Sequence, residues 1–107
     1  MSMNQDELLK SVKQVVLQFD VDAQVMLYGS RARGDYANDS DWDLLILLSR
    51  PVNLAQEMQL RRVLYHLELE TGEILSPIFD TSVSWNSERN QFSPFYKNVT
   101  QEKIMVC

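Results

Sequence analysis

Apolar positions in the first part of the chain recur with the period of an α-helix. The residues that share one face of this helix are Leu8, Leu9, Val12, Val15, Val16 and Phe19. This spacing predicts an amphipathic helix near the start of the chain. A short apolar run at Gln24–Tyr28 follows and ends at Gly29, which predicts a buried strand. The next run, Asp43–Leu48, is continuously apolar and is typical of a central strand covered on both faces.

A second long helix is predicted after the central strand. Pro51 and Asn53 open it, the pattern continues to about Thr71, and Gly72 is a suitable C-terminal stop. Its expected core stripe consists of Leu60, Val63, Leu64 and Leu67. The segment Ile74–Phe79 then predicts a third strand.

Proline interrupts this third strand at Pro77, and because proline cannot donate to a strand ladder, we expect an edge strand or a bulge. A short helix is expected over Ser82–Asn86, and Ser93 with Pro94 predicts the start of a last helix that runs to about Glu102. The order of elements indicates an α/β (α+β) fold in which helices flank a small mixed sheet.

Composition limits the size of the fold and the kind of partner. With 107 residues, 45% of them hydrophobic, residues 1–107 are expected to form a single domain. The net charge of −5 argues against a surface that binds duplex nucleic acid, so a phosphate-bearing ligand would be held locally, together with a metal. The single cysteine, Cys107, and the lack of a signal peptide or an apolar span predict a cytoplasmic protein with no membrane association.

Residues 29–34, with the sequence GSRARG, have the chemistry of a phosphate site. Gly29 lets the backbone approach a ligand, and Ser30 offers a hydroxyl beside the N–H groups at the start of a helix. Arg31 and Arg33 add positive charge to this segment, and Gly34 would end a short helix. Gly29, Ser30, Arg31 and Arg33 are therefore the candidate nucleotide-binding residues.

Two aspartates stand at the start of the central strand. Asp41 and Asp43 are two residues apart, so their carboxylates share one face of a strand, and Trp42 between them faces the opposite side and is expected to pack in the core. Carboxylates so close together repel each other unless a cation lies between them, and Mg²⁺ or Mn²⁺ suits such a pair when substrate phosphates complete its ligands. We therefore predict that both aspartates are metal ligands and catalytic residues.

Each half of this arrangement has a plain structural alternative. A Gly-Ser pair is often only a turn, and acidic residues before a strand are often only a polar loop. The two halves together, each in the expected strand context, favour a functional site.

The combination of GSRARG with Ser40-Asp41-Trp42-Asp43-Leu44 resembles the signature of the DNA polymerase β-like nucleotidyltransferase superfamily, and the short length resembles its minimal nucleotidyltransferases. The resemblance implies a nucleotidyltransferase-like fold, a triphosphate at Gly29 and Ser30, and metal at Asp41 and Asp43. It also implies transfer of a nucleotide, AMP from ATP in our interpretation, to an acceptor hydroxyl.

Members of that superfamily carry a third carboxylate on the next strand, where it helps to activate the acceptor. Here Ser76 occupies the expected position. Asp80 shares a face with Ser76 but lies about 13 Å further along the strand. Asp80, Glu70 or an acid from a partner could replace the missing group, or transfer could be slow or absent.

The resemblance also bears on partners. Minimal nucleotidyltransferases are commonly paired with a small helical HEPN-type protein in toxin–antitoxin modules, which predicts such a partner, or self-association, for this chain. Two alternatives stay open: a catalytically weak or inactive module that binds nucleotide or a partner, and an enzyme that modifies a small molecule such as an aminoglycoside.

Overall fold

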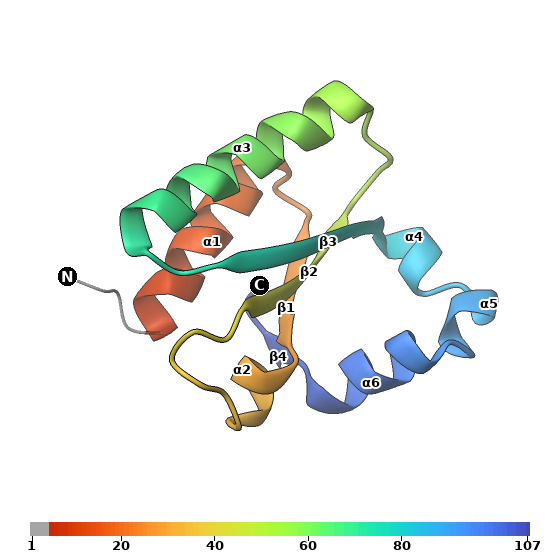
Figure 1. Ribbon diagram of the computed structural model, residues 1–107. Coiled ribbons are helices and arrows are strands. Elements are labelled where there is room, and N and C mark those ends of the chain that lie inside the picture. Colours follow the sequence, from red (N-terminus) through yellow and green to blue (C-terminus); the bar gives the residue numbers. More distant parts are fainter. Residues whose placement is uncertain (1–4) are drawn as a thin grey trace.

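The computed structural model describes residues 5–107, and its four strands form one mixed sheet (Figure 1). The strands are β1 (Gln24–Tyr28), β2 (Trp42–Leu48), β3 (Leu75–Thr81) and β4 (Ile104–Met105), and they lie in the order β3-β2-β1-β4. β1 is antiparallel to β2 and β4, whereas β3 is parallel to β2. The predicted mixed α/β fold, with the Asp43–Leu48 strand inside the sheet, is confirmed.

Two long helices cover one face of the sheet. They are α1 (Gln5–Phe19) and α3 (Leu54–Thr71), which pack against each other in Figure 1. The buried residues at this face include Leu8, Val12 and Val16 of α1, Leu60, Leu64 and Leu67 of α3, and Val25, Leu27, Trp42, Leu44 and Ile46 of the sheet. Trp42 is buried, as expected for the residue between the two aspartates.

Two of three short helices pack on the other face. The three are α4 (Ser82–Trp85), α5 (Glu88–Gln91) and α6 (Pro94–Glu102), which follow β3 around the sheet in Figure 1. α4 and α6 pack on the sheet, and α5 connects them without burying a residue of its own. The second core cluster consists of Met26, Leu45, Leu47, Trp85 and Val99, with Tyr28, Phe95 and Tyr96 packed against it. This smaller apolar cluster lies on the same face of the sheet as the side chain of Asp43, because Asp43, Leu45 and Leu47 alternate along β2.

The start and end of α3 follow from local chemistry. The Asn53 side chain accepts a hydrogen bond from the backbone N–H of Gln56, whose own side chain accepts from the Asn53 N–H, which makes a capping box. Gly72 ends the helix in the left-handed conformation at φ 75°. The prediction that Val63 belongs to the core stripe is wrong: it is 40% exposed and lines a shallow groove between α1 and α3.

β3 is a continuous edge strand, which is the first of the two outcomes expected from Pro77. The strand runs through Pro77, which pairs with Leu44 of β2 without a bulge. The prediction of an edge strand is confirmed, and the edge position explains the continuity because the missing N–H of Pro77 then leaves no ladder bond unmade. The helix α5 and the two-residue strand β4 were not predicted. Among residues 5–107, no helix has both the length and the apolar character needed to cross a membrane.

The capping box at the start of α3 gives a direct test of the fold. Replacing Asn53 with alanine removes the side-chain acceptor for the Gln56 N–H and is expected to lower the free energy of unfolding by about 1 kcal/mol. Chemical denaturation measures the loss. Gln59→Ala, an exposed change within the same helix, is the control and should leave stability unchanged or slightly higher. Equal stability of the Asn53 variant and wild type would contradict this account.

Candidate active site

The turn between β1 and β2 begins at a glycine in an unusual backbone conformation. Gly29 has φ 77° and precedes the single-turn helix α2 (Ser30–Arg33), whose start has no side-chain cap. Gly34, at φ 89°, ends this helix and its N–H donates to the carbonyl of Ser30. The sequence prediction of a strand, a sharp turn and a helix of a few residues is therefore confirmed.

Gly29 also lies directly against Asp43. A Cβ atom on residue 29 would collide with the Oδ2 atom of Asp43, and the positive φ would strain any other residue as well. The backbone of the turn and the carboxylate are thus in contact. The two halves of the sequence motif, fourteen positions apart, meet at one point.

A row of polar side chains crosses the sheet at this point. Asp43 pairs with Tyr28 of β1 on one side and with Ser76 of β3 on the other, and directly paired residues project from the same face. Asp41 joins the row because the Ser76 hydroxyl donates to its Oδ2 atom at 3.0 Å. Ser76 therefore occupies the position beside both aspartates, where the resemblance places a third carboxylate.

The electrostatic environment of Asp43 raises its pKa above the ordinary value. Partial burial, followed by the neighbouring charge of Asp41 and then of Glu102, raises the pKa of Asp43 against the opposing effect of Arg33. Burial and the charge of Asp43 together raise the pKa of Tyr28 to about 12. Negative charge around Asp43 thus exceeds positive charge, and a bound cation would reduce this repulsion.

The structure assigns Arg31 to the loop before β2 rather than to the group around Asp43. Its guanidinium donates to the carbonyl oxygens of Asn38 at 3.1 Å and of Ser40 at 3.0 and 3.2 Å. Only 7% of the residue is exposed. These bonds hold the loop that presents Asp41.

Aromatic and acidic neighbours complete the surroundings of Arg31. Its guanidinium lies 4.4 Å from the ring centroids of both Tyr36 and Trp42, and 3.7 Å from the carboxylate of Glu73. Glu73 also accepts from the Trp42 indole N–H at 3.0 Å. Trp42 faces away from Asp43 in the strand. The guanidinium of Arg31, which was predicted to bind phosphate, therefore contacts groups on the side of the sheet opposite to Asp43.

Arg33 has a different environment. It is exposed and pairs with Asp35 at 3.2 Å and with Glu102, at the end of α6, at 2.6 Å. Glu102 is close enough to Asp43 to influence its pKa. Arg33 is therefore the arginine of the GSRARG segment that lies on the side of the carboxylates, and it is held by two acids.

The other acids considered from the sequence lie elsewhere. Asp80 pairs with Leu47, four residues along β2 from Asp43, and its side chain accepts from the N–H of Thr81. Glu70 is exposed on α3. Among residues 5–107, no three acidic, histidine or cysteine side chains gather closely enough to hold a metal ion by themselves. A pair of carboxylates without a third suits Mg²⁺, which binds one or two carboxylates together with substrate phosphates.

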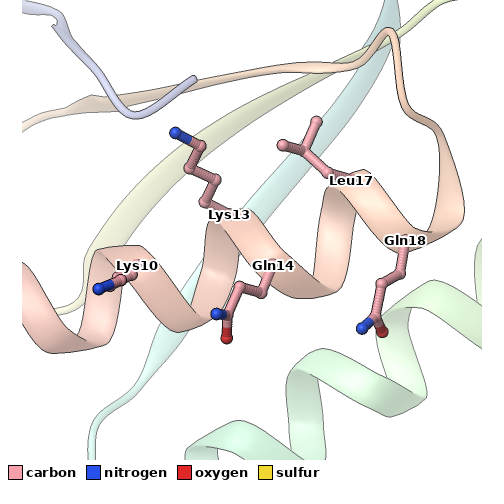
Figure 2. Close-up of a pocket in the computed structure, with 5 residues that line it drawn as sticks. All are labelled: Lys10, Lys13, Gln14, Leu17 and Gln18. Atoms are coloured by element: carbon pink, nitrogen blue, oxygen red, sulfur yellow. The ribbon is translucent and has the colours of Figure 1, made fainter.

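A hollow of about 560 Å³ along α1 is a separate feature. Figure 2 shows that its lining side chains, including Lys10 and Lys13, all come from this one helix. Since α1 covers the face of the sheet opposite to Asp43, this hollow is not part of the carboxylate site.

Tyr28 and Glu102 were not predicted as members of this site. A signal for Tyr28 existed, because it immediately precedes Gly29 and the antiparallel pairing of β1 with β2 sets it opposite Asp43. Glu102 had no such signal, since it reaches the site only through the return of the chain into β4.

A mixed sheet that sets a Gly-Ser turn against Asp43, with Asp41 beside Ser76, fits the arrangement that the resemblance to nucleotidyltransferases implies. The sequence model of the nucleotidyltransferase domain family matches residues 6–107. A candidate protein adenylyltransferase from Methanocaldococcus jannaschii is 33% identical over 75 residues, which are 67% of this chain and 75% of that protein.

Two solved structures are similar in fold. One is described as a candidate minimal nucleotidyltransferase; it has a TM-score of 0.58 and 25% identity, with 90% of this chain and 86% of that chain covered. The other is a crystal structure of a toxin–antitoxin with AMP-PNP, with a TM-score of 0.59 and 13% identity, covering 92% of this chain and 72% of that chain. The chain belongs to the nucleotidyltransferase domain family and is an enzyme of that class.

The raised pKa of Asp43 predicts how stability depends on pH. The folded chain binds this proton more tightly than the unfolded chain, so the stability that protonation contributes is present at low pH. It is lost as the pH rises from the ordinary value of 3.8 through the raised pKa. Asp43→Asn removes the charge, and we expect its melting temperature at pH 7 to equal or exceed that of wild type, with the difference vanishing below pH 3.8.

Thermal unfolding followed by circular dichroism at several pH values measures this effect. Asp39→Asn, which removes an exposed charge from the preceding loop, is the matched control. A melting temperature of Asp43→Asn clearly below wild type at neutral pH would mean that the carboxylate stabilises the fold.

Proposed function

We propose that the chain transfers AMP from ATP to a hydroxyl group on a partner protein, with Asp41 and Asp43 as catalytic residues and as ligands of Mg²⁺ or Mn²⁺. The single observation that carries the proposal is the contact between Gly29 and Asp43, because it sets a phosphate-binding turn beside a pair of carboxylates. The adenylyltransferase described for the M. jannaschii relative and the ATP analogue in the toxin–antitoxin structure support adenylate and ATP.

The triphosphate would lie alongside the turn and the carboxylates. The backbone of Gly29, the hydroxyl and N–H of Ser30, and the guanidinium of Arg33 would contact its oxygens. Arg33 would exchange Asp35 and Glu102 for phosphate when the nucleotide binds. Arg31 would contribute indirectly, by holding the loop that presents Asp41.

The transfer itself would be an in-line displacement. The acceptor oxygen forms a bond to the α-phosphorus, the bond from that phosphorus to the leaving pyrophosphate breaks, and the acceptor proton goes to a nearby base. A divalent ion, when bound, neutralises charge on the phosphates and on pyrophosphate. Asp41 and Asp43 would hold and orient that ion, and Ser76 stands where a base is expected. A serine hydroxyl is not basic at neutral pH, so the acceptor proton would pass to another carboxylate or to a base supplied by the partner.

The position of Ser76 favours a second candidate function. Without a carboxylate there, the chain could bind nucleotide and a partner while transferring AMP slowly or not at all. A partner that supplied the base would restore transfer. The toxin–antitoxin relationship of the similar fold supports a protein partner, and we propose a small helical protein of the HEPN type.

Metal dependence tests the proposed site. Because an acidic chain that offers two carboxylates repels a polyphosphate, ATP is expected to bind with Mg²⁺ and to bind about tenfold or more weakly in EDTA. Isothermal titration calorimetry measures both conditions. Asp41→Asn should weaken binding in Mg²⁺ to a similar extent, whereas Asp39→Asn, two residues away in the same loop, should not. Equal affinity with and without metal would exclude the metal-bridged arrangement.

The third position is tested by restoring its acid. A general base contributes about 10²–10⁴-fold to such steps, so Ser76→Asp is expected to raise the rate of AMP transfer or, at the least, to strengthen metal binding. Ser76→Ala controls for loss of the hydrogen bond to Asp41. Asp80→Ala should have little effect, because Asp80 lies at the far end of β3.

Incorporation of labelled adenylate into the chain and into a helical partner gives the rates. Loss of transfer in Asp80→Ala, with no gain in Ser76→Asp, would identify Asp80 as the functional acid. Absence of transfer in every variant, with nucleotide still bound, would favour the binding module.

A further inference from the structure

The outer face of α3 carries apolar residues that the domain itself does not bury. Leu54, Met58, Tyr65 and Leu69 are 71%, 52%, 56% and 64% exposed, respectively. At 3.6 residues per turn, the four positions fall within a sector of about 60° and extend about 22 Å along the helix. We refer to these four residues as the outer ridge.

The ridge is a second apolar stripe on a helix that already has one. The buried residues of α3 are Leu60, Leu64, Leu67 and Thr71, and they lie on the opposite side of the helix. In Figure 1, α3 lies on α1 and the sheet with its other side unoccupied by any element. A surface helix of a self-sufficient domain is polar on that side, so four aligned apolar residues indicate a contact surface.

Positive charge marks the middle of the ridge. Arg61 and Arg62 lie midway between Met58 and Tyr65, and both are exposed. Arg61 is fixed in place by Glu57 at 3.6 Å and by the ring of Phe79, whose centroid is 4.6 Å from the guanidinium carbon. The ridge therefore presents an apolar end, a centre with the positive charge of Arg62 beside the Arg61–Glu57 ion pair, and a second apolar end.

A hollow of about 270 Å³ adjoins the ridge at Tyr65. It lies between α3 and the outer edge of the sheet at β3, and it is lined by Arg61, Leu64, Tyr65, Glu68, Leu75 and Pro77. A space of this size, partly apolar and beside an exposed tyrosine, can receive a side chain from a docked element. The ridge thus has a neighbouring pocket as well as apolar side chains.

A second copy of this chain fits the ridge poorly. If two α3 helices packed antiparallel, Leu54 would meet Leu69 of the other copy and Met58 would meet Tyr65. The Arg61–Arg62 pair would then meet its own equivalent, and like charges at the centre of an interface are unfavourable. A helix that carries carboxylates at its centre complements the same surface.

We infer that the outer ridge docks an amphipathic helix of a different protein, one with apolar residues at i, i+4, i+11 and i+15 and with acidic residues at i+7 and i+8. The mode is that of a helix laid along an apolar surface, with charge complementarity fixing its register. α3 covers the face of the sheet opposite to Asp43 and Ser76, so this docked helix leaves the carboxylate site open. The inference rests on the proposed function for the existence of a protein partner, and it adds the surface of this chain that would bind that partner. It does not depend on catalysis.

Two synthetic helical peptides test the inference against the full chain. Both carry leucine at the four ridge-matching positions; one has two glutamates at the centre and the other has two lysines. The glutamate peptide is expected to bind with a Kd about tenfold or more below that of the lysine peptide. Chemical-shift changes in the amide spectrum of the chain should map to α3. Equal affinity of the two peptides, no binding of either, or shifts confined to other elements would overturn the inference.

Substitutions in the ridge test whether the peptide binds at these residues. Tyr65→Lys should abolish peptide binding, and Arg62→Glu should lower the affinity for the glutamate peptide by about tenfold. Val83→Lys is the control, since Val83 is exposed but lies in α4, and it should not change binding. Because the substituted side chains are exposed, circular dichroism should show unchanged folding in all three variants.

Two further measurements separate this inference from its alternatives. Sedimentation that shows a wild-type dimer, lost in Leu69→Lys, would mean that a second copy covers the ridge and would overturn the inference. Calorimetry with ATP and Mg²⁺ should give equal affinities for wild type and Tyr65→Lys. If wild type binds no ATP, the proposed nucleotide site is wrong, and the peptide experiment still tests whether the ridge docks a helix.

Discussion

The contact between the backbone of Gly29 and the carboxylate of Asp43 is the constraint on which the site depends. It requires a residue without a side chain at the end of β1, in a conformation that other residues adopt only with strain. It also fixes how closely the turn can approach β2. The short helix α2, the loop to Asp41 and the pairing of Asp43 with Tyr28 and Ser76 are all arranged around this point.

The two arginines of the turn, Arg31 and Arg33, lie on opposite sides of the sheet. Arg31 is buried among carbonyl oxygens and aromatic rings and shapes the loop from one side of the sheet. Arg33 is exposed on the other side, where acids outnumber it. The neighbourhood of Asp43 therefore has unbalanced negative charge in the absence of ligand. In the proposed function, a polyphosphate with its metal would add both the cation that the carboxylates lack and an anionic partner for Arg33.

Much of the fold could be predicted because local pattern and tertiary structure agree. The periodicity of α1, the buried run of β2, the cap at Asn53 and the stop at Gly72 are each determined by neighbouring residues. Val63 was misplaced because its environment depends on how α1 lies against α3, which no local pattern records. β4 escaped prediction because two residues carry no periodicity.

The arrangement of the candidate site could be predicted to a similar extent and for similar reasons. Gly29, Asp41 and Asp43 lie close together in the sequence, and strand geometry alone implies that the two carboxylates share a face. The resemblance placed Ser76 where a third carboxylate is expected, and the parallel register of β3 pairs Ser76 with Asp43. The engagement of Arg31 with the far side of the sheet could not be inferred, since it depends on the positions of Tyr36, Trp42 and Glu73 in space.

The parallel pairing of β2 with β3 also sets the order in which the site can assemble. The antiparallel strands β1 and β2 are close in sequence, so Gly29 and Asp43 can meet after closure of one modest loop. The Ser76–Asp41 bond joins residues separated by the crossover that contains α3, and the Arg33–Glu102 pair spans still more of the chain. Contacts of such sequence separation form slowly. A nascent chain would thus acquire its turn and its carboxylate pair first, and the residues that surround them later.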